Sequence, residues 1–507
     1  MPDINFHIAR LVAYAVKNGL VSRADKTWTV NMMLSVLRLD SFEEPSIVDY
    51  NLPKYPSGIL SEISKWAAAN GLIENLPVSR EILEGELCGI ITPRPFQFTA
   101  KFEEIEKRSG IKKAAAWMYK TQQQCDYIKI ERAEKNLAWK TDTKYGKLDI
   151  TVNLSKPEKT PEEIAAVKKL GAAALSRNIY PKCMLCRENE GYRGRLNYPA
   201  RQNIRLIPLK LNGEKWFFQY SPYIYYNEHC IVLNGCHTDM AINKDTFVRL
   251  ADFLERFPHY FIGSNADLPV VGGSILNHDH YQGGRYTFPM HKVKTRKTFK
   301  IKNLPDIECE ILDWPLSVLR FSGSRRGVLK AANIAFDAWV NYNDPAVAIR
   351  AYDGQTRHNT VTPMARIAKG KLQLDIALRN NAASEEFPEG IFHSHKQFHH
   401  IKRENIGLIE VMGLAILPGR LKSEFEELSD CLVKNDFEKI KNSLAISKHY
   451  DWALKLADRY KFTPENAEEI LRKETGTIFA EVLECCGVFK KTLCGAAALD
   501  RFLKTLS

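Results

Sequence analysis

Apolar and polar residues follow a helical period at both ends of the chain. Near the N-terminus, apolar residues recur at spacings of three and four, which predicts an amphipathic helix. Residues 61–70 and 102–120 predict two further helices, and Ser61 is suited to cap the first of them. The helical pattern returns over residues 423–507. The first apolar stripe consists of Phe6, Ala9, Val12, Ala13 and Val16.

The middle of the chain has the shorter period of β-strands. Residues 148–154 alternate between apolar and polar, which predicts a strand with two different faces. Asn212-Gly213 separates two apolar runs and predicts a hairpin. We expect a loop over residues 156–161 and helices over 162–176 and 246–257. The other predicted strands cover 204–211, 216–220, 230–233, 365–369 and 372–378.

Composition limits the class of protein. The 507 residues are 45% apolar and 26% charged, as in soluble globular enzymes, which excludes a collagen-like, coiled-coil or largely disordered chain. No apolar run approaches the ~18 residues of a membrane helix, and the N-terminus lacks a secretory-signal pattern. We therefore expect a cytoplasmic protein without a membrane partner. Eleven cysteines are too sparse for a disulfide scaffold.

The net charge of +12 favours anionic partners. Nucleic acids and phosphorylated small molecules both satisfy that condition. The basic residues are dispersed and no nucleic-acid-binding motif is present, so we expect no nucleic-acid partner. A strand over residues 292–302 would have one basic face, which either borders an anionic substrate or is simply solvated. That face comprises Lys292, Lys294, Arg296, Lys300 and Lys302.

The segment from Gly272 to Gly284 carries the strongest chemical signal. In an extended strand, His278, His280 and Gln282 share one face. Histidine can attack phosphorus covalently, and an amide donor can stabilise charge that develops on a phosphoryl oxygen. Glycine pairs bracket the segment and allow backbone amides to approach an anion. The alternative interpretation is that the histidines are structural or bind a metal.

Cys183 and Cys186 have the spacing of half a structural zinc site. The chain has no second Cys-x-x-Cys pair, so the remaining ligands would be histidines, with His237 and His278 as candidates. Two buried thiols without a metal are the alternative. A second His-x-His, at His393 and His395, either marks a duplicated half or belongs to a surface histidine cluster.

With these motifs, the sequence resembles the class II galactose-1-phosphate uridylyltransferases. The run from Asp267 to Gly284 resembles their signature, although Asn277 replaces an expected hydroxyl residue. Residues 148–157, 180–191 and 399–420 extend the resemblance over most of the chain.

The resemblance implies an α+β fold with two histidine-triad-like antiparallel halves and helical ends. The corresponding domains are 1–145 (helical), 146–304 (catalytic half), 305–422 (second half) and 423–507 (helical). The helical ends either form a homodimer interface or cover the core.

The resemblance also implies a two-step reaction of galactose metabolism. UDP-glucose would transfer its uridylyl group to His280 and release glucose 1-phosphate, and galactose 1-phosphate would then take the group to give UDP-galactose. Gln282 would hold the transferring phosphoryl group. No organic cofactor is expected. Gly283 and Gly284 are implied substrate-binding residues. The class I enzymes are more distant relatives with the histidine-triad type of fold, and the chain resembles them less closely. That resemblance implies substrate-binding roles for Asn265 and Ser274, and it implies zinc ligands at Cys183, Cys186, His237 and His278.

Two other functions compete with this one. If water replaced the sugar phosphate, the chain would be a nucleotide hydrolase of the histidine-triad type. Gln282 disfavours that alternative, because such hydrolases usually have a third histidine at this position. A nucleic-acid-binding protein is the non-enzymatic alternative, and it rests only on the charge of +12.

Overall fold

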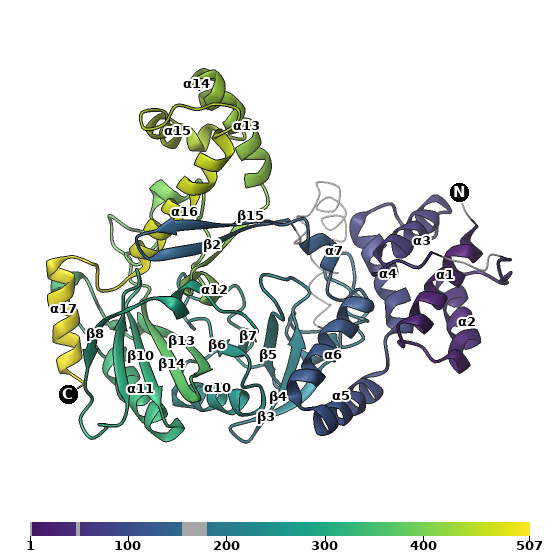
Figure 1. Ribbon diagram of the computed structural model, residues 1–507, viewed down its shortest axis with the longest axis horizontal. Coiled ribbons are helices and arrows are strands. Elements are labelled where there is room, and N and C mark those ends of the chain that lie inside the picture. The colour runs from purple at the N-terminus through teal and green to yellow at the C-terminus, as the bar shows by residue number, and fades with distance from the viewer. Residues whose placement is uncertain (1–2, 47–50, 155–179, 507) are drawn as a thin grey trace. The chain divides into compact units, whose positions relative to one another are not determined.

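The computed structural model describes residues 3–46, 51–154 and 180–506 (Figure 1). The predicted loop at 156–161 and helix at 162–176 lie outside these residues. The chain divides into two compact units. The first unit comprises the described parts of residues 1–135, 155–224 and 228–238, and the second comprises 136–154, 225–227 and 239–507. The four-domain division drawn from the sequence stays a prediction.

Helices dominate the beginning of the first unit. In α1 the buried apolar face differs from the predicted stripe: Ile8, Leu11 and Ala15 are buried, whereas Phe6 and Val16 are only half-buried. The predicted apolar stripe is therefore rotated about the helix axis relative to the face that is buried. The helices are α1 (Ile4–Lys17), α2 (Lys26–Leu37), α3 (Ser57–Ala69), α4 (Pro77–Ile91), α5 (Pro95–Ser109), α6 (Ile111–Gln124) and α7 (Ile130–Ala133).

Two helix boundaries differ from the prediction. Ser61 does not cap a helix, because α3 already begins at Ser57 behind Pro56. The single helix expected over 102–120 is two helices, α5 and α6, separated by Gly110. Gly110 has a φ of 83°, a left-handed conformation that glycine adopts without steric cost and that interrupts the helix.

The first unit also contains three antiparallel strands, β3 (Ile207–Leu211), β4 (Glu214–Tyr220) and β5 (Cys230–Asn234). Asn212 and Gly213 join the first two with φ values of 47° and 79°. Positive φ at both turn positions matches the twist of a two-residue hairpin. The hairpin predicted from the Asn-Gly pair is confirmed.

An antiparallel sheet forms the centre of the second unit. Lys369 and Gly370 form the turn of the hairpin between β13 (Asn359–Ala368) and β14 (Lys371–Asn380). Their φ values of 50° and 75° are positive, as at Asn212 and Gly213. Helices α10 (Lys244–Arg256) and α11 (Arg325–Val340) pack on its strands. The strands, in spatial order, are β7 (His280–Gly284), β6 (Phe261–Gly263), β13 (Asn359–Ala368), β14 (Lys371–Asn380), β10 (Val318–Gly323), β9 (Glu308–Leu312) and β8 (Thr295–Phe299).

A smaller sheet in the same unit joins distant parts of the sequence. β2 (Gly146–Asn153) pairs antiparallel with β1 (Leu137–Thr143) and parallel with β15 (Leu414–Pro418). The strand predicted at 148–154 is confirmed, but both of its faces are buried over Leu148–Asn153. β2 is the central strand of this sheet, which explains why its polar residues are covered as well.

Helices end the chain, as the sequence predicts. Figure 1 shows α13, α14 and α15 grouped together, with α16 leading from them towards α17. Along this path α16 packs against β1. None of the helices in the described ranges is long and apolar enough to cross a membrane. The combination of many helices with mostly antiparallel sheets confirms the predicted α+β class. These helices are α12 (Leu408–Val411), α13 (Leu421–Lys434), α14 (Phe437–Asn442), α15 (Tyr450–Ala457), α16 (Ala467–Cys486) and α17 (Leu493–Lys504).

Shorter elements complete the described chain. Single turns of 3₁₀ helix are η1 (Arg23–Asp25), η2 (Arg187–Asn189), η3 (Pro289–Lys292), η4 (Pro345–Val347), η5 (Lys396–Phe398) and η6 (Ser447–His449). A two-stranded ribbon pairs β11 (Tyr352–Asp353) with β12 (Thr356–Arg357).

Candidate functional site

The histidine motif lies where a loop of the second unit enters strand β7. The alternating pattern predicts that His278 lies in the strand with His280. The strand in fact begins at His280, and His278 lies in the loop before it. β7 pairs antiparallel with β6, which places Gln282 opposite Gly263. His280 and Gln282 are two residues apart in the strand and therefore point to the same face. His278 and His280 are buried and Gln282 is half-buried.

One hydrogen bond fixes the orientation of the His280 ring. Its Nδ1 lies 2.8 Å from the carbonyl oxygen of His278, and a carbonyl can only accept. Nδ1 therefore carries the hydrogen, and in the neutral ring Nε2 keeps its lone pair. Burial lowers the pKa of His280 to about 4, so the ring is neutral at physiological pH. A buried neutral imidazole with an oriented lone pair can act as a nucleophile.

The alternate residues of the motif face the other way and are structural. Asp279 is buried and forms an ion pair with Arg249 of α10 at 3.9 Å. Tyr281 is fully buried, and burial raises its pKa. These contacts hold β7 against α10, so the two sides of the motif have separate roles, as the strand pattern predicts.

The glycine pair at Gly272 and Gly273 has a packing role in its own loop. A Cβ atom at Gly272 would lie 2.6 Å from the carbonyl oxygen of Ala266, and one at Gly273 would lie 2.6 Å from Nδ2 of Asn265. Such distances exclude larger residues. Gly283 and Gly284 are not outside the strand but form its last two residues, and the Gly283 carbonyl accepts from Tyr226 at 3.1 Å.

Asn265 holds the segment before the motif against α12. Its Oδ1 accepts from the backbone N–H of Leu408 at 2.8 Å, and its side chain is buried. Asn405 adds a second link, because its Nδ2 donates to the carbonyl of Gly272 at 3.3 Å. Ser274, by contrast, is exposed in the loop. The structure therefore gives Asn265 an anchoring contact that the sequence did not indicate.

Asp267 is a further anchoring residue that the sequence analysis did not single out. Its buried carboxylate accepts from the backbone of Ile242 at 2.9 Å, from Arg357 at 2.6 Å and from Thr360 at 2.5 Å. Charge-assisted bonds of this kind are stronger than neutral ones. Two of the three partners lie about ninety residues away along the chain, so no local sequence signal could reveal this role.

The cysteine pair lies in a turn of the first unit together with His237. The Sγ atoms of Cys183 and Cys186 are 3.5 Å apart, and Cys186 Sγ lies 3.2 Å from Nδ1 of His237. Nδ2 of Asn189 donates to the carbonyls of both cysteines, at 2.9 and 2.7 Å. Asn189 is in turn held by the hydroxyl of Tyr198 at 2.8 Å. These bonds shape the turn so that both thiols point to one place.

These three side chains suit a zinc ion. Tetrahedral zinc with ligands at about 2.3 Å (sulfur) and 2.0 Å (nitrogen) separates neighbouring ligand atoms by roughly 3.5 to 3.8 Å. The three ligand atoms lie within 4.8 Å of one another, and none of the cysteines is in a disulfide. The prediction of a group that can hold a metal is confirmed. The alternative of two buried thiols does not explain why the His237 imidazole converges on them.

The second His-x-His is not a surface cluster. His393 is buried, and His395 stacks on Phe387 with a ring separation of 4.2 Å and contacts Cys485 Sγ through Nδ1 at 3.5 Å. Within the described ranges, neither histidine belongs to a metal-binding group. These contacts fix His395 within the second unit and leave the idea of a duplicated half untested.

The basic face expected over 292–302 lies at the edge of the sheet. Only Thr295–Phe299 form a strand, β8, which is the last strand in the order and is mostly exposed. Lys297 pairs with Asp500 of α17 at 2.5 Å. The solvated-face interpretation accounts for these residues, and lysines on an edge strand also discourage pairing with other chains.

Comparison with known proteins decides the family. Residues 37–239 match the model of the galactose-1-phosphate uridyl transferase N-terminal domain, and residues 253–454 match that of the C-terminal domain. This chain belongs to the galactose-1-phosphate uridylyltransferase family. The predicted family and the predicted enzyme class, a nucleotidyltransferase, are confirmed.

Relatives in the family match over their whole length. The galactose-1-phosphate uridylyltransferase of Halalkalibacterium halodurans is 48% identical over 100% of this chain and 99% of its own. That of Clostridium acetobutylicum is 45% identical over 99% and 100%, respectively. That of Bacillus subtilis is 44% identical over 99% and 97%. The family therefore spans both units, including the helices at the two ends.

Proposed function

We propose that this chain transfers a uridylyl group from UDP-glucose to galactose 1-phosphate through a covalent intermediate on His280. The observation that carries the proposal is the bond from Nδ1 of His280 to the His278 carbonyl, which leaves Nε2 as the reactive atom. The family relationship supplies the substrates, since the relatives are uridylyltransferases of galactose 1-phosphate.

In the first step, Nε2 of His280 attacks the α-phosphorus of UDP-glucose. An N–P bond forms, the bond from the α-phosphorus to the bridging oxygen breaks, and glucose 1-phosphate leaves with that electron pair. In the second step, a phosphate oxygen of galactose 1-phosphate attacks the same phosphorus, and the N–P bond breaks. UDP-galactose leaves and the neutral imidazole is restored, so the scheme is a ping-pong reaction.

Gln282 is suited to stabilise the charge that develops during both steps. It lies on the same face of β7 as His280, and its amide can donate to a non-bridging oxygen of the transferring group. We assign substrate-binding roles to Gly283 and Gly284 at the end of the strand, and to Asn265 and Ser274 in the loop before the motif. Of these four, Ser274 is the exposed residue.

We propose that zinc has a structural role here. Cys183, Cys186 and His237 supply three ligands, and His278 is the fourth, as the resemblance to the class I enzymes implies. A bound zinc would contribute folding free energy. His278 would then have two separate functions, because its side chain would bind the metal while its carbonyl orients His280.

Steady-state kinetics test the proposal. A ping-pong reaction gives parallel lines in double-reciprocal plots when UDP-glucose is varied at several concentrations of galactose 1-phosphate. Intersecting lines would contradict a covalent intermediate. Release of UMP by water in place of transfer would favour the nucleotide-hydrolase alternative, and tight, salt-dependent RNA binding without turnover would favour the nucleic-acid alternative. We place the reaction in the cytoplasm, and homodimer formation stays a prediction.

A further inference from the structure

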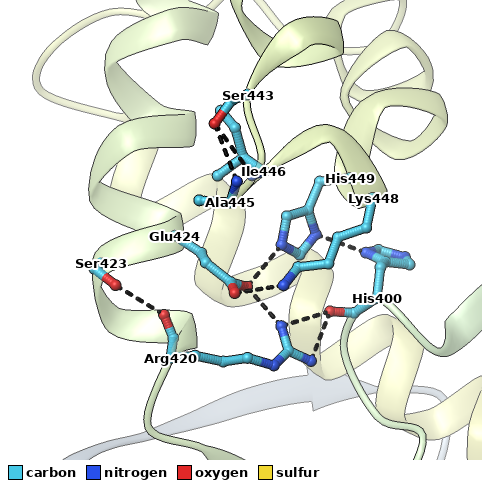
Figure 2. Close-up of polar contacts among 9 residues, drawn as sticks. All are labelled: His400, Arg420, Ser423, Glu424, Ser443, Ala445, Ile446, Lys448 and His449. Carbon is cyan, nitrogen blue, oxygen red and sulfur yellow. Dashed lines mark hydrogen bonds and ion pairs between the residues drawn. The ribbon is translucent and has the colours of Figure 1, made fainter. Parts of the chain in front are cut away.

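A buried network of charged and histidine side chains lies among the C-terminal helices of the second unit (Figure 2). At its centre, Glu424 of α13 is 5% exposed. Its carboxylate accepts from Arg420 at 2.6 Å, from Lys448 at 2.5 Å and from Nε2 of His449 at 3.0 Å. The uridylyl-transfer mechanism uses none of these residues.

The network extends from Glu424 through His449 to His400. The carboxylate can only accept, so Nε2 of His449 carries a hydrogen. Nδ1 of His449 lies 2.8 Å from Nδ1 of His400, and one of the two must donate. With both rings neutral, Nδ1 of His400 donates to His449, and Nε2 of His400 carries a lone pair. In the described part of the chain, that Nε2 has no hydrogen-bond partner.

His400 lines a cavity of about 1380 Å³ whose walls belong entirely to the second unit. Lys448 and Lys455 line the same cavity. None of the cavity residues belongs to the strand of His280, its preceding loop or the cysteine group. The cavity also includes Trp452 and Phe398, and its remaining charged residues are Glu389, Lys396, Arg403, Asp451, Asp458, Arg459, Glu474 and Glu481.

The cavity wall as a whole carries five basic and five acidic side chains, but the charged groups that act most strongly on His400 are cations. Burial is the largest cause of its low pKa, followed by the neighbouring His449 ring and the cations Arg420, Lys448 and Lys455. Glu424 is the only carboxylate in the network and faces two permanent cations, Arg420 and Lys448. Lys455 has no ion pair within the described residues, although Asp451 lies one helical turn before it. Uncompensated cations beside a partly buried ring favour an anion.

We propose that the corner formed by His400, Lys448 and Lys455 binds the phosphate group of a phosphorylated small molecule, at a site separate from His280. A bound phosphate would offset the charge of these cations and allow His400 to take up a proton. The protonated ring would donate from Nε2 to the phosphate while Nδ1 still donates to His449, so the network would not need to rearrange.

Inorganic phosphate serves as the probe, and its dissociation constant is measured by calorimetry on the full-length protein. His400→Asn removes Nε2, but its amide can still donate to His449, so the network survives. Lys455→Gln removes one cation. Lys461→Gln is the matched control, because Lys461 is exposed and lies outside the cavity. His400→Asn and Lys455→Gln should each weaken binding about tenfold, the size of one charge-assisted hydrogen bond.

The control should bind phosphate as the wild type does, and all three variants should keep the wild-type rate of uridylyl transfer. Equal dissociation constants in all four proteins would overturn the proposal. A transfer rate that falls together with phosphate affinity would also overturn it, because the cavity would then belong to the transfer site. Phosphate binding in His280→Ala separates this proposal from the proposed function, since the second site should persist in that variant.

Discussion

Nδ1 of His280 donates to the carbonyl of His278, the residue two positions earlier, over 2.8 Å. This hydrogen bond joins the side chain of His280 to the backbone of the loop before β7. It fixes the tautomer of His280, the proposed nucleophile, and it connects the loop that precedes β7 to the proposed catalytic residue. The buried anchors of that loop, Asn265 and Asp267, therefore influence where Nε2 points.

Gln282→Ala should lower kcat by about 10²-fold with little change in KM, because the amide is proposed to donate mainly to the charge that develops in the transition state. Initial rates of UDP-galactose formation measure the effect. Gln282→Glu is the stricter variant, since it keeps the size and adds a negative charge beside the phosphates. Wild-type kcat in either variant would contradict the assigned role.

Cys183→Ser should remove zinc and destabilise the protein by several kcal/mol, on the order expected for loss of a structural metal. Elemental analysis gives the zinc content, and thermal unfolding gives the stability. Cys494→Ser is the control, because Cys494 is exposed on α17. If purified active protein contains no zinc, the metal assignment is wrong.

Glu424→Gln should lower the free energy of unfolding at pH 7 by about 3 kcal/mol, the usual cost of breaking a buried ion pair. Burial alone would raise the pKa of Glu424, but hydrogen bonds from His449 and Lys448 outweigh it and lower the pKa to about 2. The folded pKa lies below the ordinary value of 4.5, so the stabilisation is complete above that value.

Urea unfolding of the wild type and of Glu424→Gln at pH values between 7 and 2 measures how the difference in their free energies of unfolding depends on pH. As the pH falls from about 4.5 towards 2, the wild type should lose the stabilisation from Glu424. The difference between wild type and Glu424→Gln should therefore shrink over that range. A difference that stays constant down to pH 2 would mean that the carboxylate is not the source of the stability.

Local signals in the sequence predicted the elements that depend on local geometry. The Asn212-Gly213 hairpin and the strand β2 follow from turn chemistry and strand period, and both are present, although both faces of β2 are buried. The break at Gly110 was missed, because an isolated glycine in a helical pattern is compatible with a continuous helix. The buried face of α1 was misplaced because Phe6 and Val16 are apolar but only half-buried, so apolar character alone does not define the face that meets the core.

For the site, the sequence located the motif but not the residues that support it. His280 and Gln282 are close in sequence, so strand geometry alone places them on one face. Arg420 is one helical turn from Glu424, but the other partners of Asp267 and Glu424 lie 24 to 93 residues away along the chain. Contacts over such separations depend on the tertiary fold, and a single sequence contains no periodicity that reveals them.

The most direct test of the account is the intact mass of the protein after incubation with UDP-glucose alone. The wild type should gain the mass of one uridylyl group and lose it when galactose 1-phosphate is added. His280→Ala should gain nothing while keeping its circular dichroism spectrum, and His259→Asn, a histidine outside the motif, should behave as the wild type. An adduct that persists in His280→Ala, or transfer without any adduct in the wild type, would contradict the covalent mechanism.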